Sequence, residues 1–232
     1  MTVAQRVTLS DTTLGILKNF SGINSNILIR PGNVLKTVSP MKNIMGSARI
    51  EETFDREIAI WDLNQFLGTV SLFDKPDFEF EDKFVTIYGE KGASVQYFYS
   101  APNLITTVNK DIEMPDTAVS FELKQKQLNE IQKASSVLGV PDLCVRSNGE
   151  KIEMVALDKK VSSSNSYSID LGDNQSSFGE ANFKFYFKVE NLKMVSGDYT
   201  VNISEKVVSE FVNTSVDVTY YIALESDSVY TK

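Results

Sequence analysis

The strongest constraint on the fold is that the chain presents the same pattern of elements twice, in the same order. A shift of 114 residues aligns the apolar positions of two helix patterns, placing Leu14, Leu17 and Phe20 on Leu128, Ile131 and Ala134. A shift of 129 residues aligns a second, shorter pair, placing 63–68 on 192–197. We therefore expect two similar domains, 1–110 and 111–232, joined through the proline-containing stretch 101–120.

Most of the remaining sequence consists of short segments that alternate apolar and polar residues between turn residues, a pattern typical of antiparallel strands. Helical periods occur at 10–20, where Ser10 is a good N-cap, at 121–138, and over the short stretches WDLNQFL and VENLKMV. These elements predict an α+β fold in which each domain is an antiparallel sheet with two helices on one face. In the stretch WDLNQFL, we expect Trp61 to face the sheet.

The helix pattern at 121–138 has an unusual outer face. At 100° per residue, Leu128, Ile131 and Leu138 share one arc. The opposite arc is mostly amide with two lysines, and Glu122 lies at its middle: Gln125, Lys126, Asn129, Gln132 and Lys133. Solvent faces usually mix Glu with Lys. An amide and lysine face therefore needs a reason in a chain whose net charge is −8.

Composition removes most catalytic chemistry. The chain has no histidine, which excludes Ser-His-Asp and Cys-His nucleophile systems, and its single cysteine, Cys144, is expected to be a buried thiol. Acidic residues are scattered, and Glu51 and Glu52 are interpreted as part of a solvated strand face. No run of residues has the length and apolarity of a membrane span or a signal peptide. We expect a protein that stays where it is made, with no metal site and no cofactor.

Four segments together resemble the DNA polymerase sliding clamp of T4-type bacteriophages: LSDTTLGILKNFSGINSNILI, EIAIWDLNQFLGTVSLF, LKMVSGDYTV and YYIALESDS. The resemblance runs from about residue 9 to 228, and residues 1–8 look like an extension. It implies the DNA clamp fold, assembled as a homotrimeric ring whose helices surround duplex DNA. It also implies a processivity factor without enzymatic activity. Such a clamp is placed on DNA by an ATP-driven clamp loader, tethers the replicative polymerase and serves late transcription. Its location is the cytoplasm of the infected bacterial host.

The resemblance assigns two sets of candidate residues. The DNA-facing set is Lys18, Asn64, Lys126, Lys133 and Lys193. A partner-peptide groove is expected between the connector and the C-terminal strand, from Leu104, Ile105, Val108, Tyr221, Ala223 and Leu224. The same residues also fit a plainer interpretation, as solvent-facing lysines, a packed linker and buried strand positions. Subunit contacts are expected near 94–99 and 167–171.

Two other functions fit part of the sequence. A non-enzymatic, β-rich phage structural protein would share the turn-rich strands and the acidity, but it has no reason to repeat a lysine and amide helix face. A carboxylate-dependent metal nuclease would need Asp and Glu side chains clustered in space, which the sequence alone does not decide.

Overall fold

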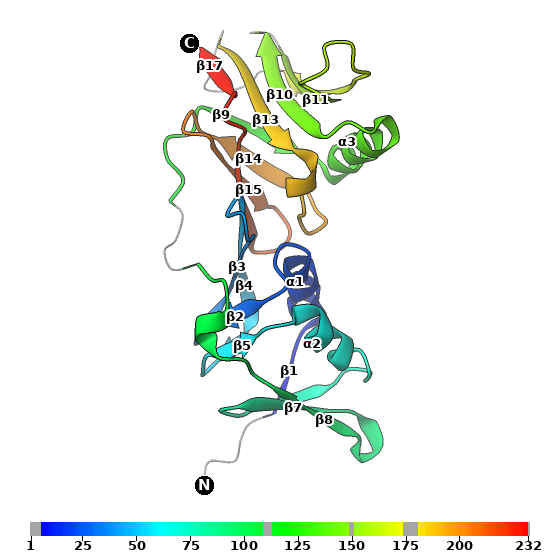
Figure 1. Ribbon diagram of the computed structural model, residues 1–232, viewed down its shortest axis with the longest axis vertical. Helices are drawn as coiled ribbons and strands as arrows, with labels where there is room; N and C mark the ends of the chain where they lie inside the picture. The colour runs from blue at the N-terminus through cyan, green and yellow to red at the C-terminus, as the bar shows by residue number, and fades with distance from the viewer. Residues whose placement is uncertain (1–5, 109–112, 149–150, 174–180, 232) are drawn as a thin grey trace. The chain divides into compact units, whose positions relative to one another are not determined.

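The computed structural model describes residues 6–108, 113–148, 151–173 and 181–231, and the chain divides into two compact units, Met1–Lys110 and Asp111–Lys232 (Figure 1). In these described ranges no helix is long and apolar enough to cross a membrane. The same residues contain no group of three Asp, Glu or Cys side chains placed to hold a metal ion.

The described residues of the first unit form two α-helices, two short 3₁₀ turns and eight strands. In chain order these are β1 (Val7–Thr8), α1 (Asp11–Ser21), β2 (Ile27–Ile29), β3 (Gly32–Val38), β4 (Ile44–Phe54), β5 (Ile58–Ile60), α2 (Leu63–Val70), β6 (Asp77–Phe80), β7 (Phe84–Tyr88), η1 (Glu90–Gly92), β8 (Ser94–Phe98) and η2 (Pro102–Leu104). Antiparallel pairing joins β3 with β4 and β2 with β5, and it builds a sheet of order β1-β6-β7-β8.

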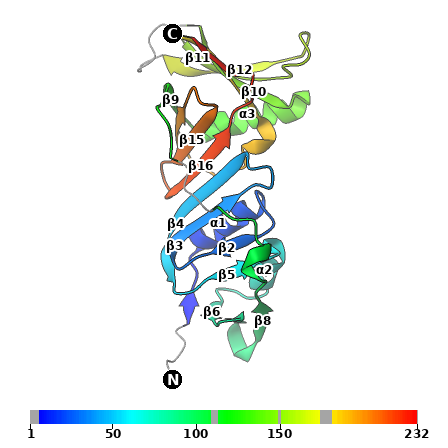
Figure 2. The ribbon, with the colours of Figure 1, turned by 60° about the vertical axis from the view of Figure 1, so that its left-hand side comes forward.

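The core of the first unit lies under its helices. α1 packs beside α2 and across β4 (Figure 2). Its inner face buries Ile16, Leu17 and Phe20, while α2 buries Leu63 and Phe66. The approach to β4 is so close that a Cβ on Gly46 would lie 2.8 Å from the Phe20 ring. A residue without a side chain is therefore required under the helix.

The described residues of the second unit form one α-helix, one 3₁₀ turn and nine strands. They are β9 (Val119–Leu123), α3 (Gln125–Leu138), β10 (Asp142–Asn148), β11 (Lys151–Leu157), β12 (Tyr167–Asp173), β13 (Asn182–Lys188), η3 (Val189–Asn191), β14 (Tyr199–Ile203), β15 (Val208–Asn213), β16 (Val218–Ala223) and β17 (Val229–Thr231). One sheet has the order β12-β11-β10-β13-β17, and β16-β15-β14-β9 run side by side in a second, all antiparallel.

α3 packs against β11 and β12 (Figure 1) and buries Leu128 and Ile131, as the apolar arc predicts. It ends at Gly139, whose φ of 66° is the left-handed C-cap conformation that glycine adopts without strain. α1 begins at Asp11 and α3 at Gln125, 114 residues later, which equals the shift between the two helix patterns. The α+β fold with two similar units agrees with the prediction.

Three local predictions are wrong. Residues 121–123 belong to β9 instead of the helix, because Leu123 pairs with Tyr199 of β14, and Glu122 therefore leaves the polar arc. VENLKMV forms only the turn η3, so α3 is the one α-helix among the described residues of the second unit. Trp61 precedes α2 and is 56% exposed instead of facing the sheet.

Candidate nucleic-acid interface and peptide groove

The outer face of α1 is held in place from a distant strand. Ser10 caps the helix, its Oγ accepting from the Thr13 amide at 3.2 Å. The acid that completes the cap is Glu52 of β4, which accepts from the Ser10 amide and, over 2.5 Å, from Thr13 Oγ1. Burial raises the pKa of Glu52, but the hydrogen bonds from Thr13 and Ser10 outweigh it and hold the pKa below 4.5.

This anchored face exposes few charges. Asp11, Thr12, Gly15 and Lys18 of α1 are exposed, and Lys18 makes no ion pair within the described part of the chain. On the adjoining α2, Asn64 is exposed. The Asp62 carboxylate is used as N-cap, accepting from the Gln65 amide at 2.8 Å. The two helices together offer one lysine, opposed by Asp11, among neutral polar groups.

α3 supplies the second face. Lys126, Asn129 and Lys133 are exposed, and in the described residues neither lysine has an acidic group within ion-pair distance. A separation of seven residues places the two lysines on one stripe, about 10 Å apart along the axis. Glu130 lies between them on the same stripe and accepts a hydrogen bond from Tyr167 of β12. The stripe therefore carries two positive charges around one negative charge.

Two amides of the predicted polar arc have structural roles instead. Gln125 Nε2 donates to Asn129 Oδ1 at 2.6 Å, and its Oε1 accepts from the Gly197 amide. Gln132 Nε2 donates to the Leu192 carbonyl at 3.0 Å. Both side chains therefore fasten α3 to the segment 192–198, which a helical wheel drawn for α3 alone does not reveal.

The same segment determines where α3 begins. The Gln125 amide donates to Asp198 Oδ1 at 2.8 Å, and Lys124 Nζ lies 3.2 Å from Asp198 Oδ2. The backbone hydrogen bond from Gln125, followed by that from the Lys124 side chain, lowers the pKa of Asp198. Lys193, the remaining predicted lysine, is exposed beyond η3.

The predicted groove residues fall in both units. In the first, Leu104 is 56% exposed, but Ile105 is buried with Leu28 and Ala59. Arg30 Nη1 donates to the Val108 carbonyl at 3.0 Å, which holds the start of the connector. Burial of Ile105 agrees with the plainer interpretation of that residue as part of a packed linker.

In the second unit, Tyr221 and Ala223 are partly exposed at the end of β16, whereas Leu224 is 7% exposed. The Leu224 amide donates to the carbonyl of Val207 at 2.9 Å. Val207 is 44% exposed in the turn between β14 and β15, with φ 55°. Sequence reasoning missed this residue, since its exposure and its backbone conformation have no local sequence signal.

Comparison with known proteins identifies the family. One family model, described as DNA polymerase processivity factor, matches residues 10–105, and another, described as gp45 sliding clamp, C terminal, matches residues 120–226. The sliding clamp of Vibrio phage KVP40 is 33% identical over 223 residues, which covers 94% of this chain and 99% of the relative. The chain belongs to the sliding-clamp family.

Other sliding clamps match over the same length. That of Enterobacteria phage T4 is 29% identical and covers 96% of this chain, with 98% of the T4 protein matched. A. fulgidus PCNA, solved with the C-terminal region of FEN-1, superposes with a TM-score of 0.72 at 14% identity, over 97% of this chain and 99% of that one. The PCNA2–PCNA3 complex of Sulfolobus tokodaii gives 0.69 at 13% identity, over 96% and 99%. At such low identity these structures establish the clamp fold alone.

Proposed function

We propose that this chain is a DNA sliding clamp that encircles duplex DNA as a homotrimeric ring and tethers the replicative polymerase. The observation that carries the proposal is the pair of helix faces on which Lys18, Lys126 and Lys133 remain without acidic partners in the described residues, in a chain of net charge −8. Isolated lysines among amides contact phosphates without reading bases. The acidity of the rest of the chain disfavours binding of DNA elsewhere on the surface.

The ring requires a head-to-tail contact between copies. β8 forms one edge of its sheet, and β12 forms one edge of the large sheet of the second unit. Beside β8 lies a cavity of about 540 Å³, lined by Trp61 and Gln65 among others, and Phe98 is 65% exposed. Pairing β8 of one copy with β12 of the next is a heterologous contact, which closes into a ring when the rotation fits.

The tethering function requires a site for partner peptides. We assign it to Tyr221, Ala223 and Leu224 at the C-terminal strand of the second unit. Two structures of the same fold carry partner segments: A. fulgidus PCNA bears the C-terminal region of FEN-1, and the Helicobacter pylori beta clamp bears a DNA ligase peptide. They support peptide docking as a use of this fold.

The remaining partners follow from the same proposal. A closed ring needs an ATP-driven loader to open it, and a mobile platform on DNA also suits late-transcription factors. The protein acts by binding alone, without catalysis, in the cytoplasm of the infected host. Membership of the sliding-clamp family favours this function over a phage structural protein and over a metal nuclease.

Retention on circular DNA tests the proposal. The protein is loaded onto a nicked circle with the clamp loader and ATP, and gel filtration in high salt measures what stays bound. We expect retention on the circle and loss after a single cut, since free ends release a ring. A linear control with blocked ends should retain the protein.

An electrostatic groove binder behaves differently. Its affinity falls with salt by a slope of about −0.9 per phosphate contact, and it binds linear duplex without a loader. Tight binding of the free protein to linear DNA at physiological salt, or retention after cutting with open ends, would overturn the topological mechanism.

A further inference from the structure

A half-buried ionic cluster lies where the chain leaves β16. The Lys159 side chain is 12% exposed, and its Nζ lies 2.6 Å from Asp227 Oδ1 and 3.2 Å from Glu225 Oε2. The same Nζ lies 5.1 Å from the centroid of the Tyr186 ring. One lysine from the segment after β11 thus holds both acids of the C-terminal tail, which we define as residues 224–228.

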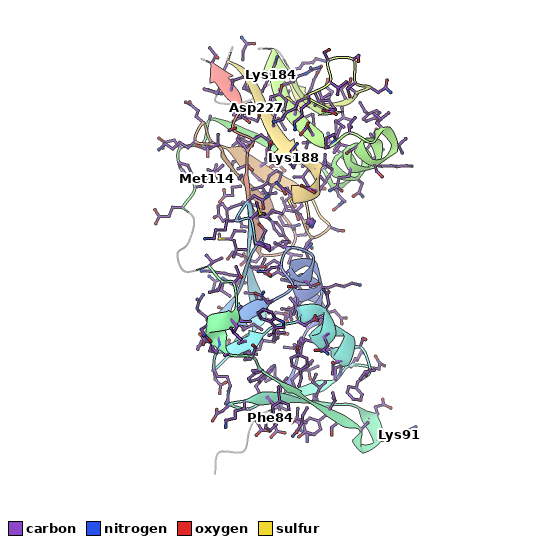
Figure 3. All side chains as sticks on the ribbon, in the orientation of Figure 1. Phe84, Lys91, Met114, Lys184, Lys188 and Asp227 are labelled. Atoms are coloured by element: carbon purple, nitrogen blue, oxygen red, sulfur yellow. The ribbon has the colours of Figure 1, made fainter. Side chains whose placement is uncertain are left out.

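The backbone of Lys159 is itself held by a buried residue of β10. Its amide donates to Asp142 Oδ2 at 3.1 Å, and Asp142, a fully buried residue of β10, pairs through Oδ1 with Lys188 Nζ at 2.5 Å. Figure 3 shows Lys188 and Asp227 along β13. The cluster therefore connects the tail to the centre of the large sheet.

Main-chain hydrogen bonds give the tail a single path. The Leu224 amide donates to the Val207 carbonyl at 2.9 Å, and the Glu225 amide donates to the Tyr186 carbonyl at 2.8 Å. The Tyr186 amide donates to Ser228 Oγ at 2.9 Å. These bonds guide the backbone at three positions, but they leave Glu225 and Asp227 as two like charges, both of which lie within ion-pair distance of Lys159.

The ionisation of the cluster agrees with this geometry. Burial lowers the pKa of Lys159, but the hydrogen bonds to Asp227 and Glu225 outweigh it and leave that pKa raised. The hydrogen bond from Lys159 lowers the pKa of Asp227. Lys159 and Asp227 are therefore both charged near neutral pH, where they attract each other.

We propose that Lys159 is a positioning residue for partner binding: it holds the tail in one conformation where the tail leaves β16, so that this end of the peptide groove, next to Tyr221 and Ala223, is formed before a partner binds. The proposal rests on the proposed function, since it assumes that partners dock at this wall. A tail ordered before binding spares the partner the entropic cost of ordering it.

The chain offers matched variants for a test. Lys159→Met keeps the length and the apolar stem but removes the charge, and Lys159→Arg keeps the charge. Lys160→Met is the control, because Lys160 is exposed and makes no ion pair in the described residues. Asp227→Asn, a change at an exposed partner, is a milder variant should Lys159→Met fold poorly.

Two measurements are made on each full-length variant. Hydrogen exchange reports the amides of residues 223–229, and a binding titration reports affinity for the purified replicative polymerase of the same phage. Lys159→Met should lose protection in the tail and bind polymerase about tenfold more weakly. Lys159→Arg and Lys160→Met should match the wild type, and Asp227→Asn should lie between.

The outcomes separate the two proposals. If the wild type does not bind polymerase, the tethering function is wrong. If the wild type binds and Lys159→Met binds equally well despite a loosened tail, the positioning role is wrong. Retained tail protection in Lys159→Met would also overturn the role, since the tail would then be held without the lysine.

Discussion

Val207 adopts a φ of 55°, in the left-handed region that a β-branched residue rarely enters. The turn between β14 and β15 imposes this conformation, and the Val207 carbonyl in turn fixes the Leu224 amide. Strain of this kind costs on the order of 1–3 kcal/mol and persists where the surroundings enforce it. Its place beside the proposed groove favours a role for the exposed Val207 side chain in binding.

Val207→Asn should therefore raise the free energy of unfolding by about 1 kcal/mol, because asparagine tolerates the left-handed region better than valine. Thermal unfolding at one fixed protein concentration measures the change. Val229→Asn is the control, since Val229 is also exposed but lies in β17. A Val207→Asn variant no more stable than Val229→Asn would show that the turn accommodates valine without strain. If the side chain also contacts partners, the stabilised variant binds polymerase more weakly.

Which residues could be found from sequence depends on how far away their partners lie. Ser10 was recognised as an N-cap because its partner amide is three residues away. The sequence pattern places Glu52 on a solvated strand face, yet Glu52 completes the same cap from β4. Glu130 lies on the outer face of α3, and its partner Tyr167 comes from another element, β12.

The Glu52 cap makes stability depend on pH. The pKa of Glu52 in the folded state lies below the unfolded value of 4.5. The contribution of Glu52 to the free energy of unfolding is therefore fully present above pH 4.5 and is lost as the pH falls through the folded-state pKa. Glu52→Gln should cost about 1 kcal/mol at pH 7, with the difference from wild type shrinking below pH 4.5. Denaturant unfolding at several pH values measures it, with Glu51→Gln as the exposed neighbour for control. A difference that is constant with pH would assign the cost to packing.

At the scale of elements, periodicity predicted the two long helices and the strands but not all of their ends. α3 starts after β9 because Leu123 pairs with Tyr199 and Asp198 receives the Gln125 amide, both non-local contacts. VENLKMV failed as a helix for a related reason: Gln132 of α3 holds the Leu192 carbonyl, so the segment follows α3 instead of forming its own helix.

The exposed stripe of α3 allows a direct test of the DNA-facing assignment. The double variant Lys126→Glu with Lys133→Glu should reduce polymerase processivity strongly. With Glu130 between them, all three charged positions of the stripe would then be acidic and would repel the phosphates of DNA. Stability should change by about 1 kcal/mol or less, since these sites are exposed. The matched control is Lys83→Glu with Lys160→Glu, which changes charge equally at exposed positions away from the helices. Equal processivity in the two double variants would make the stripe an ordinary solvent face.

At the scale of the whole molecule, the proposed assembly depends on the unpaired edge of β8. The Tyr99 amide donates to the Lys83 carbonyl next to β7, and successive residues of a strand point their N–H groups to opposite sides. Counting back along the strand, the Gln96 N–H points away from β7, toward the edge that a second copy would pair with. Gln96 itself is exposed.

Proline at position 96 should therefore remove a donor between subunits while keeping every hydrogen bond to β7. We expect Gln96→Pro to shift a light-scattering dilution series from trimer to monomer at concentrations where Gln96→Ala remains trimeric. Circular dichroism should show that both variants keep the strand content of the wild type. A folded Gln96→Pro protein that stays trimeric throughout the series would place the subunit contact elsewhere. A wild type that is monomeric at every concentration would instead exclude the ring, and with it the topological hold on DNA.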